Sequence, residues 1–248
     1  MIRSGSLVIS AGMPRAGSGW YYNLMHDLVV ASGGRDTRQI RREYHLSWLL
    51  TEVNCNLSTL STVRLLPVLL PALSGERFVI KTHAGATELV RWLIRHRKIF
   101  VAYIYRDPRA ALLSAYEYGT RARAQSRQNA FAQLATIDEA VIYYKKYLKI
   151  WESWHKIPEV LITRYENLMQ DYEQETVRLM DFLNIDAGAS QVNEVIEKYS
   201  PEHGSPALKG IHFGHGEAER FRRVLSPEQL ARITQAFGES LVVMGYKL

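Results

Sequence analysis

Residues 7–24 read LVISAGMPRAGSGWYYNL, which is an apolar run, a glycine-rich turn and a second apolar run in succession. The first three residues predict a short buried strand, and residues 18–31 predict a helix. The glycines at the turn (Gly12, Gly17 and Gly19) let the backbone approach a ligand closely. The helix N-terminus adds free N–H groups and a partial positive charge. The stretch therefore predicts a binding site for an anion.

The spacing Gly12-x4-Gly17 is that of the phosphate-binding loop of nucleoside triphosphatases, but the rest of that motif is missing. Such a loop continues with Lys and then Ser or Thr, which serve the β- and γ-phosphates and Mg²⁺. Here Ser18 and Gly19 occupy those places, and the cation stands earlier, at Arg15. We therefore expect a phosphate-like ligand held by arginine. A phosphotransferase that uses ATP and Mg²⁺ is the alternative.

Three further apolar runs, at 78–83, 99–105 and 160–163, predict strands separated by helical segments. This alternation indicates an α/β fold with a mostly parallel central sheet and helices on both faces. The 248 residues show no linker and no repeat, so one domain spanning residues 1–248 is expected. In such sheets ligands bind beyond the carboxyl ends of the strands.

The other elements are predicted from periodicity, caps and chain breakers. Helices are expected at 43–53, 57–70, 87–97, 109–119, 172–183 and 190–199, with Pro67 and Pro71 as breaks. Thr136 and Glu139 predict a capping box for a long helix, whose aromatic face we interpret as packing. Ser226 and Pro227 open the last helix. Loops are expected at 32–42, 120–129 and 200–220.

Charge and cysteine content narrow the classes of function. A net charge of +6 suits an anionic partner, but the basic residues form no run of five, so nucleic-acid binding is not favoured. The single cysteine, Cys55, is typical of a reducing compartment. No signal peptide and no apolar run of membrane-spanning length are visible, so we expect a cytoplasmic protein.

Polar side chains follow each predicted strand. Arg15 follows the first strand, Lys81 and His83 end the second, Arg106 follows the third and Tyr165 follows the fourth. Because parallel strands bring their carboxyl ends to one edge of the sheet, these side chains are expected close together. A histidine, whose pKa lies near neutrality, suits proton transfer from a hydroxyl or an amine.

Asp107 allows two interpretations. It could hold Mg²⁺ at the end of its strand, as the ATP alternative requires. Because Pro108 follows it, Asp107 fits better as the N-cap of the next helix, with proline at the first helical position. Two cationic sites without a persuasive metal site favour a nucleotide with phosphates at two separate positions.

Four motifs resemble, in the same order, those of sulfotransferases that use 3′-phosphoadenosine 5′-phosphosulfate (PAPS). Residues 14–20, PRAGSGW, resemble the 5′-phosphosulfate loop, and residues 106–109, RDPR, with Ser114 resemble the 3′-phosphate motif. Residues 81–83, KTH, are similar to the Lys-x-His of the cytosolic branch, and residues 165–168, YENL, to its Tyr-Glu-Asp-Leu segment. The resemblance covers residues 7 to about 170 and implies a sulfotransferase fold related to the P-loop proteins.

The resemblance implies binding roles for matching residues. Arg15 would hold the 5′-phosphate with the N–H groups of four loop residues, namely Ala16, Gly17, Ser18 and Gly19. Trp20 would stack on adenine and Tyr165 would touch the same ring. Arg106 and Ser114 would bind the 3′-phosphate.

The resemblance also implies the chemistry. His83 would be the general base that takes the proton of the acceptor, while Lys81 and Arg15 steady the charge on the sulfuryl oxygens. The transferred group carries a single charge, so lysine and arginine can replace a metal, and no metal is implied. The acceptor, a hydroxyl or amine of a small molecule, lipid or carbohydrate, is not specified by the sequence, nor is the oligomeric state.

Two departures from the family pattern and one rival base leave questions open. Ala16, Ser18 and Gly19 stand where the family commonly has Ser, Thr and Thr. The late Arg-Lys-Gly-x-x-Gly segment is replaced by residues 212–216, HFGHG, followed by Arg220 to Arg223, which have no assigned role. Glu43 is a rival to His83 as the base, although a solvated glutamate is the preferred interpretation.

Overall fold

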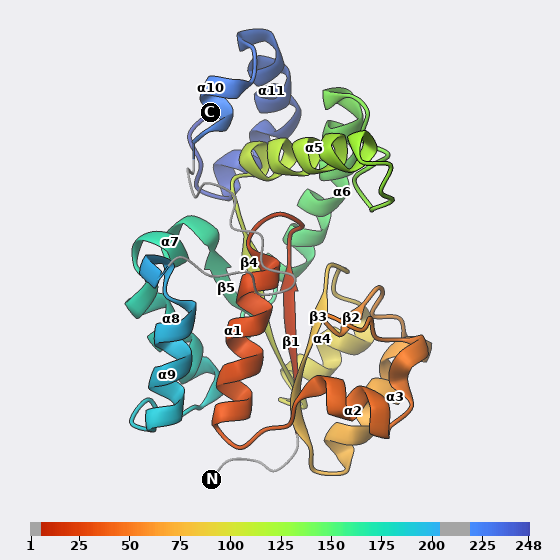
Figure 1. Ribbon diagram of the computed structural model, residues 1–248, viewed down its shortest axis with the longest axis vertical. Coiled ribbons are helices and arrows are strands. Elements are labelled where there is room, and N and C mark those ends of the chain that lie inside the picture. The colour runs from red at the N-terminus through yellow and green to blue at the C-terminus, as the bar shows by residue number, and fades with distance from the viewer. Residues whose placement is uncertain (1–5, 204–218) are drawn as a thin grey trace.

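The computed structural model describes residues 6–203 and 219–248. In these two ranges, five parallel strands form one sheet in the order β2-β3-β1-β4-β5. The strands are β1 (Ser6–Gly12), β2 (Asn56–Leu57), β3 (Arg77–Thr82), β4 (Ile99–Tyr105) and β5 (Leu161–Arg164). Helices cover both faces of the sheet (Figure 1), which confirms the predicted α/β class.

The helices of the first group precede the long helix α6 in the chain. They are α1 (Ser18–Ala31), α2 (Thr37–Glu43), the short 3-10 helix η1 (Leu46–Trp48), α3 (Thr62–Leu73), α4 (Glu88–Arg95) and α5 (Pro108–Ala124). The later ones are α6 (Ile137–His155), α7 (Tyr165–Gln170), α8 (Tyr172–Leu183), α9 (Ser190–Tyr199), η2 (Pro201–His203), α10 (Phe221–Val224) and α11 (Pro227–Val243). Among the described residues, none of these helices is both long and apolar enough to cross a membrane.

Strand β4 is apolar throughout because each face of the sheet is covered. On one face of β4, Tyr103 lies 6.4 Å from Trp154 of α6, measured between ring centroids. On the other, Phe100 meets Phe182 of α8 edge-on at 5.9 Å. Every residue of β1 is buried. The core therefore runs through β1 and β4, and the loops at their carboxyl ends rest on a rigid base.

Three predicted caps are present. Asp107 accepts a hydrogen bond from the N–H of Arg109 and starts α5, with Pro108 at the first helical position. Thr136 and Glu139 form the capping box of α6. Ser226 accepts from Gln229 N–H at the start of α11. Helices α8 and α9 have the predicted bounds.

Several predicted boundaries are wrong, and one strand was missed. Residues 32–42 contain helix α2, which Asp36 caps by accepting from the N–H of Arg38, and the predicted helix at 43–53 is reduced to η1 and turns. The strand β2 was not predicted, since it is a two-residue edge strand defined by its pairing with β3. Helix α5 continues to Ala124, so the predicted loop at 120–129 starts later.

Pro67 and Pro71 lie inside α3 and do not break it. The predicted helix at 57–70 is thereby shifted to 62–73. Each proline removes one backbone donor from the helix. Burial of Leu65, Val68 and Leu69 offsets this loss, since most helical stability in proteins comes from packing.

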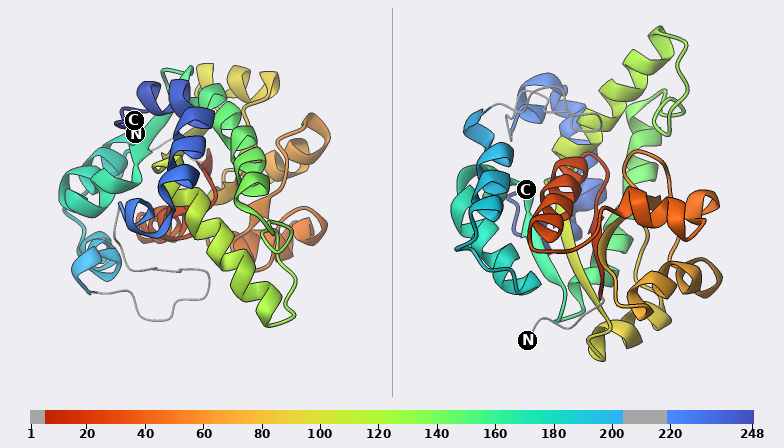
Figure 2. Two further views of the ribbon diagram at one scale, coloured as in Figure 1. Left: turned by 90° about the horizontal axis from the view of Figure 1, so that it is seen from above. Right: turned by 60° about the horizontal axis from the view of Figure 1, so that its bottom comes forward.

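The carboxyl edge of the sheet is covered by a group of later helices. Seen from above in Figure 2, α5, α6 and α11 lie over this edge. The guanidinium of Arg109 on α5 donates to the carbonyl of Lys247, and Arg220 pairs with Glu117. The part of the loop predicted at 200–220 that spans residues 204–218, including the HFGHG segment, lies outside the described residues.

Candidate functional site

The glycine loop is fixed to the centre of the sheet. The N–H of Met13 donates to the carbonyl of Ile104 on β4 at 2.9 Å, and Met13 is fully buried. Arg15 and Gly17 both adopt left-handed backbone angles, with φ of 63° and 76°. The N–H of Ala16 donates to Met13 O over 3.3 Å, so this donor closes the turn. The loop then enters α1, whose first turn begins at Ser18.

Gly17 is required for two reasons. A left-handed φ favours glycine, and a Cβ at this position would lie 2.7 Å from Cδ2 of Tyr165. Tyr165 therefore packs directly on the loop. Both residues were predicted to lie at the carboxyl edge of the sheet. Glycine also offers no side chain to cap α1, so the N-terminus of this helix is available to an anion.

Arg15 lies between the loop and α5. Its Nε donates to the hydroxyl of Ser114 at 3.2 Å, and its guanidinium lies over the ring of Tyr118 at 4.6 Å. Burial lowers the pKa of Arg15, and the positive charge of Arg106 acts in the same direction. Three residues predicted to bind an anion, Arg15, Arg106 and Ser114, are thus brought together.

Arg106 lies over the ring of Tyr165, with its guanidinium carbon 4.7 Å from the ring centroid. Tyr165 in turn meets Trp20 edge-on at 6.4 Å. Trp20 is almost fully buried, stacks on Tyr172 at 5.9 Å, and donates from Nε1 to the carbonyl of Tyr199. The predicted adenine contacts therefore form one aromatic group beside Arg106.

His83 is held by the loop itself. Its Nδ1 lies 2.6 Å from the carbonyl oxygen of Gly12. A carbonyl only accepts, so Nδ1 carries the proton and, in the neutral ring, Nε2 has the free lone pair. Burial and the charge of Lys81 lower the pKa of His83 to about 3, although the bond to Gly12 opposes the shift.

Lys81 completes the cationic group. It is the fifth residue of β3 and is buried. Burial, together with the positive charge of Arg15, lowers the pKa of Lys81 to about 8. Cations that are buried near one another disfavour each other's charge, and an anionic ligand reverses that effect. The electrostatics of Lys81, His83 and Arg15 therefore fit an anion between the loop and β3.

Asp107 is engaged in the structure of α5. Its two carboxylate oxygens accept from the Arg109 side chain at 3.1 and 2.8 Å, and its own N–H donates to Glu166. Among the described residues there is no group of three or more His, Cys, Asp or Glu side chains placed to hold a metal ion. The expectation that Asp107 is an N-cap is confirmed.

Glu43 lies at the other end of the sheet. Its carboxylate is exposed and accepts two hydrogen bonds from Arg35, at 2.8 and 2.7 Å. The N–H of Arg35 donates to the carbonyl of Arg77, the first residue of β3. Lys81 and His83 lie at the carboxyl end of that strand, so Glu43 is placed far from them.

Two neighbours of the site were not predicted. The hydroxyl of Tyr144 on α6 lies 2.9 Å from the carbonyl of Pro14 and 2.8 Å from that of Ala111. The carboxylate of Asp27 on α1 accepts from Lys198 and from the hydroxyl of Tyr199, whose carbonyl holds Trp20. Sequence spacing carries no signal for these contacts, since the residues that they join are from 33 to 172 positions apart.

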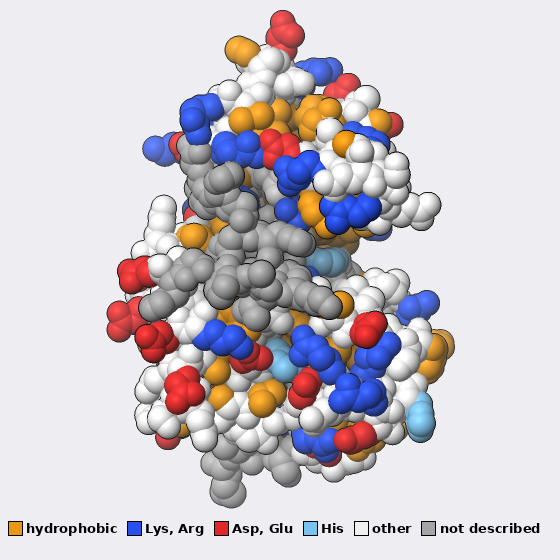
Figure 3. Space-filling model, viewed as in Figure 1, with side chains coloured by type: hydrophobic (Ala, Val, Ile, Leu, Met, Phe, Trp, Pro, Cys, Tyr) orange, Lys and Arg blue, Asp and Glu red, His pale blue; other side chains and the backbone are white. Residues whose placement is uncertain are grey.

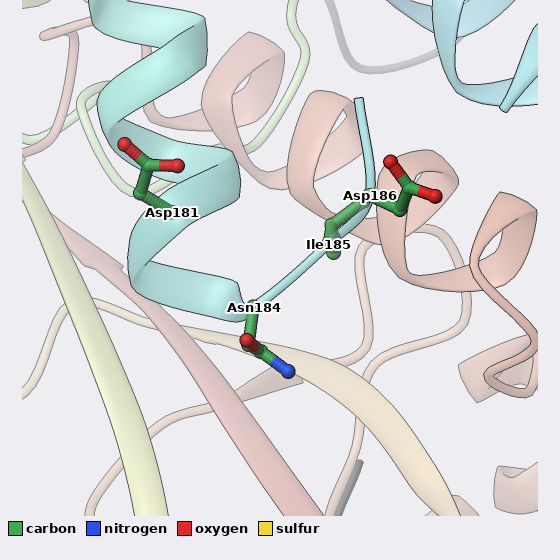
Figure 4. Close-up of a pocket in the computed structure, with 4 residues that line it drawn as sticks. All are labelled: Asp181, Asn184, Ile185 and Asp186. Carbon is green, nitrogen blue, oxygen red and sulfur yellow. The ribbon is translucent and has the colours of Figure 1, made fainter. Parts of the chain in front are cut away.

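A separate surface pocket lies away from this group. It is lined by Asp181, Asn184, Ile185 and Asp186, at the end of α8 (Figure 4). The carbonyl of Leu183 at that place accepts from Arg77, at the amino end of β3. The pocket is therefore at the edge of the sheet opposite the cationic group, and we assign it no role in the site.

Comparisons with known proteins agree with this fold. The profile of the Sulfotransferase domain matches residues 6–245. Sulfotransferase 6B1 of Danio rerio is 21% identical, over 94% of this chain and 78% of that protein. The structure of mouse sulfotransferase SULT7A1 complexed with PAP superposes with a TM-score of 0.60 at 18% identity, covering 96% of this chain and 85% of that one. Retinol dehydratase in complex with androsterone and inactive cofactor PAP gives 0.57 at 17% identity, covering 98% and 82%.

Proposed function

The chain belongs to the Sulfotransferase domain family, and on that premise we propose that it moves a sulfuryl group from PAPS to a hydroxyl or amine, with His83 as general base. The acceptor would be a small molecule, a lipid or a carbohydrate. The observation that carries the proposal is the bond from His83 Nδ1 to the Gly12 carbonyl. It attaches the base to the same loop that would hold the donor.

The buried cations fit the donor. Arg15 and the N-terminus of α1 would bind the 5′-phosphosulfate, and Arg106 with Ser114 would bind the 3′-phosphate. Trp20 and Tyr165 would contact adenine. PAPS supplies the sulfuryl group when it is bound. Buried positive charge supports binding of this donor. The pKa values of Arg15 and Lys81 are both lowered, as expected for buried cations that have no anion beside them.

The chain's own residues would act on the acceptor and on the transferred group. Nε2 of His83 would accept the acceptor's proton as the new bond to sulfur forms and the bond from sulfur to the 5′-phosphate oxygen breaks, so that PAP is the leaving group. Such base catalysis typically contributes about 10²- to 10⁴-fold. Lys81 and Arg15 would stabilise the negative charge spread over the sulfuryl oxygens. Binding of an anion raises the pKa of His83 from its low value and so makes it a better base.

Calorimetry with adenosine 3′,5′-bisphosphate (PAP) tests the donor assignment. We expect binding in the micromolar range or tighter; no binding at high micromolar concentration would reject the assignment. Thermal stabilisation by Mg-ATP and not by PAP would favour the phosphotransferase alternative, because a ligand of the folded state raises stability by mass action.

Substitution of His83 tests the base. His83→Ala is expected to keep PAP affinity and to lower turnover, measured with labelled PAPS on a panel of hydroxyl and amine acceptors, by about 10²-fold or more. The matched variant is Glu43→Gln, which removes the rival base and breaks only the exposed pair with Arg35. Full activity in His83→Ala, or loss of activity in Glu43→Gln alone, would remove His83 from this role.

A further inference from the structure

Helix α3 has an apolar stripe that no described part of the chain covers. Its members are exposed by 76%, 51%, 56% and 79% respectively: Val63, Leu66, Leu70 and Leu73. They follow one another at intervals of three, four and three residues, which at about 100° per residue keeps them within an arc of roughly 80°. The other side of the helix is buried on the sheet. A helix that is apolar all round is normally covered on every side.

The charge around the stripe is mostly positive, although Glu52 and Glu76 lie just outside residues 53–75. Between Val53 and Gly75 the chain has one charged residue, the exposed Arg64, and no acidic one. Figure 3 shows hydrophobic side chains along the right-hand edge, where α3 lies, beside a group of Lys and Arg side chains over α2 that has a smaller number of Asp and Glu side chains among it. The neighbouring helix α4, joined to the start of α3 by the Thr87–Leu60 hydrogen bond, ends in residues 95–98, RHRK, all exposed.

Two tryptophans are exposed on helices that come before and after α3 in the chain. Trp92 on α4 and Trp48 in η1 are each more than half exposed, and Trp92 stacks on His96 at 4.4 Å. Tryptophan suits a boundary between water and lipid because it joins a large apolar ring to one polar N–H group. A stripe of leucine and valine with flanking cations and tryptophan has the composition of a surface that lies in the plane of an anionic membrane.

We propose that the α3 stripe docks on an anionic lipid surface. Burial of the four side chains would supply the apolar part of the binding, and Arg64 with residues 95–98 would supply the electrostatic part. A second copy of this chain is a poorer occupant, since a twofold contact would bring the same cationic rims together. The proposal concerns this surface alone and does not depend on the acceptor or on catalysis.

Co-sedimentation with lipid vesicles tests the proposal without an activity assay. The probes are phosphatidylcholine vesicles with and without phosphatidylserine, at low and high salt. The wild-type chain is expected to bind the anionic vesicles and to release as salt rises, because screening weakens the electrostatic part. The pair Leu66→Gln and Leu70→Gln together should weaken binding by about tenfold or more, since two apolar contacts with lipid are lost.

The matched control replaces exposed apolar residues elsewhere. Ile142→Gln with Val242→Gln, on α6 and α11, changes the same number of exposed side chains and should bind vesicles as the wild type does. The proposal is overturned if wild type binds neither kind of vesicle, or if both double variants lose binding equally. Self-association of wild type that Leu66→Gln and Leu70→Gln abolish, without vesicle binding, would identify the stripe as a contact between copies and would also overturn it.

Discussion

The Nε of Arg15 donates a hydrogen bond to the hydroxyl of Ser114, 3.2 Å away, across 99 positions of sequence. Sequence motifs assign these residues to different phosphates of one nucleotide. In the structure they touch, so the glycine loop and helix α5 share a polar contact between the two proposed anion sites. We therefore expect binding at one proposed site to affect the other.

Ser114→Ala should weaken PAP binding by about tenfold, because it removes both a ligand contact and the partner that orients the Arg15 guanidinium. Calorimetry at constant pH and salt measures this. Ser240→Ala, at a half-buried position within α11, is the matched control and should leave the affinity unchanged. Equal affinities for Ser114→Ala and wild type would show that the contact carries no binding energy.

His83 should make the unliganded protein sensitive to acid. Its pKa is lowered from 6.5 to about 3 in the folded state, so between these values the unfolded chain binds a proton that the folded chain does not. Stability is therefore lost as the pH falls through this window, with a slope of at most about 1.4 kcal/mol per pH unit from this group. Urea unfolding between about pH 7 and about pH 4 compares the slope of the unfolding free energy against pH in wild type and in His83→Gln. Identical slopes would contradict the prediction.

Lys81→Met should stabilise the unliganded protein. The pKa of Lys81 is lowered from 10.5 to about 8, so its charged form at neutral pH is disfavoured by up to about 3 kcal/mol relative to solution. Chemical denaturation at pH 7 measures the gain, and Lys145→Met on the exposed side of α6 serves as the control. The same variant should be stabilised less by PAP than wild type is. A Lys81→Met variant that is less stable than wild type would contradict the prediction that burial and the charge of Arg15 make charged Lys81 destabilising.

Gly17→Ala separates backbone strain from contact. The variant forces a side chain into φ of 76° and brings Cβ to 2.7 Å from Tyr165. Gly75→Ala forces a side chain into a similar left-handed backbone conformation, with φ of 98°, but its Cβ would have no atom within 4 Å. Gly75→Ala should lose about 1 kcal/mol of stability, and Gly17→Ala should lose more, because the contact with Tyr165 adds to the backbone strain. Only Gly17→Ala should also lose PAP affinity, by calorimetry, and equal affinities in the two variants would show that Tyr165 does not contribute.

Asp27 is expected to position Trp20. Burial alone would raise the pKa of Asp27, but hydrogen bonds from His26, Lys198 and Tyr199 outweigh it and hold the pKa well below its usual value. Asp27→Asn should raise KM for PAPS several-fold and leave kcat nearly unchanged, because Asp27 acts on the ring through Tyr199. The lowered pKa means that ionised Asp27 stabilises the folded state at neutral pH. Wild type should lose this stabilisation, relative to Asp27→Asn, as the pH falls below the usual pKa of an aspartate. A fall in kcat alone would argue against a positioning role.

The elements that local chemistry controls could be predicted from the sequence. The continuous apolar run of β4 requires cover on both faces, and the caps at Asp107, Thr136 and Ser226 involve residues two or three positions apart. The strand-end rule also brought Lys81 and Arg106 to one edge of the sheet, because in a parallel sheet that edge is common to all strands.

The elements that depend on distant partners could not be predicted. Helix α2 is anchored by Thr37, whose hydroxyl donates to Val79 across 42 positions, and β2 exists through its pairing with β3. The prolines of α3 are tolerated because its buried face packs on the sheet. In the site, the contact of Arg15 with Tyr118 has no counterpart in any local pattern.

The position of Tyr144 has a consequence for nucleotide choice. One hydroxyl group on α6 meets the carbonyls of Pro14, in the loop, and Ala111, in α5. The Tyr144 hydroxyl thereby restrains the distance between the two proposed phosphate sites in the protein without a ligand. A restrained spacing would favour nucleotides whose two phosphates match it, although the hydroxyl that restrains it need not touch either phosphate.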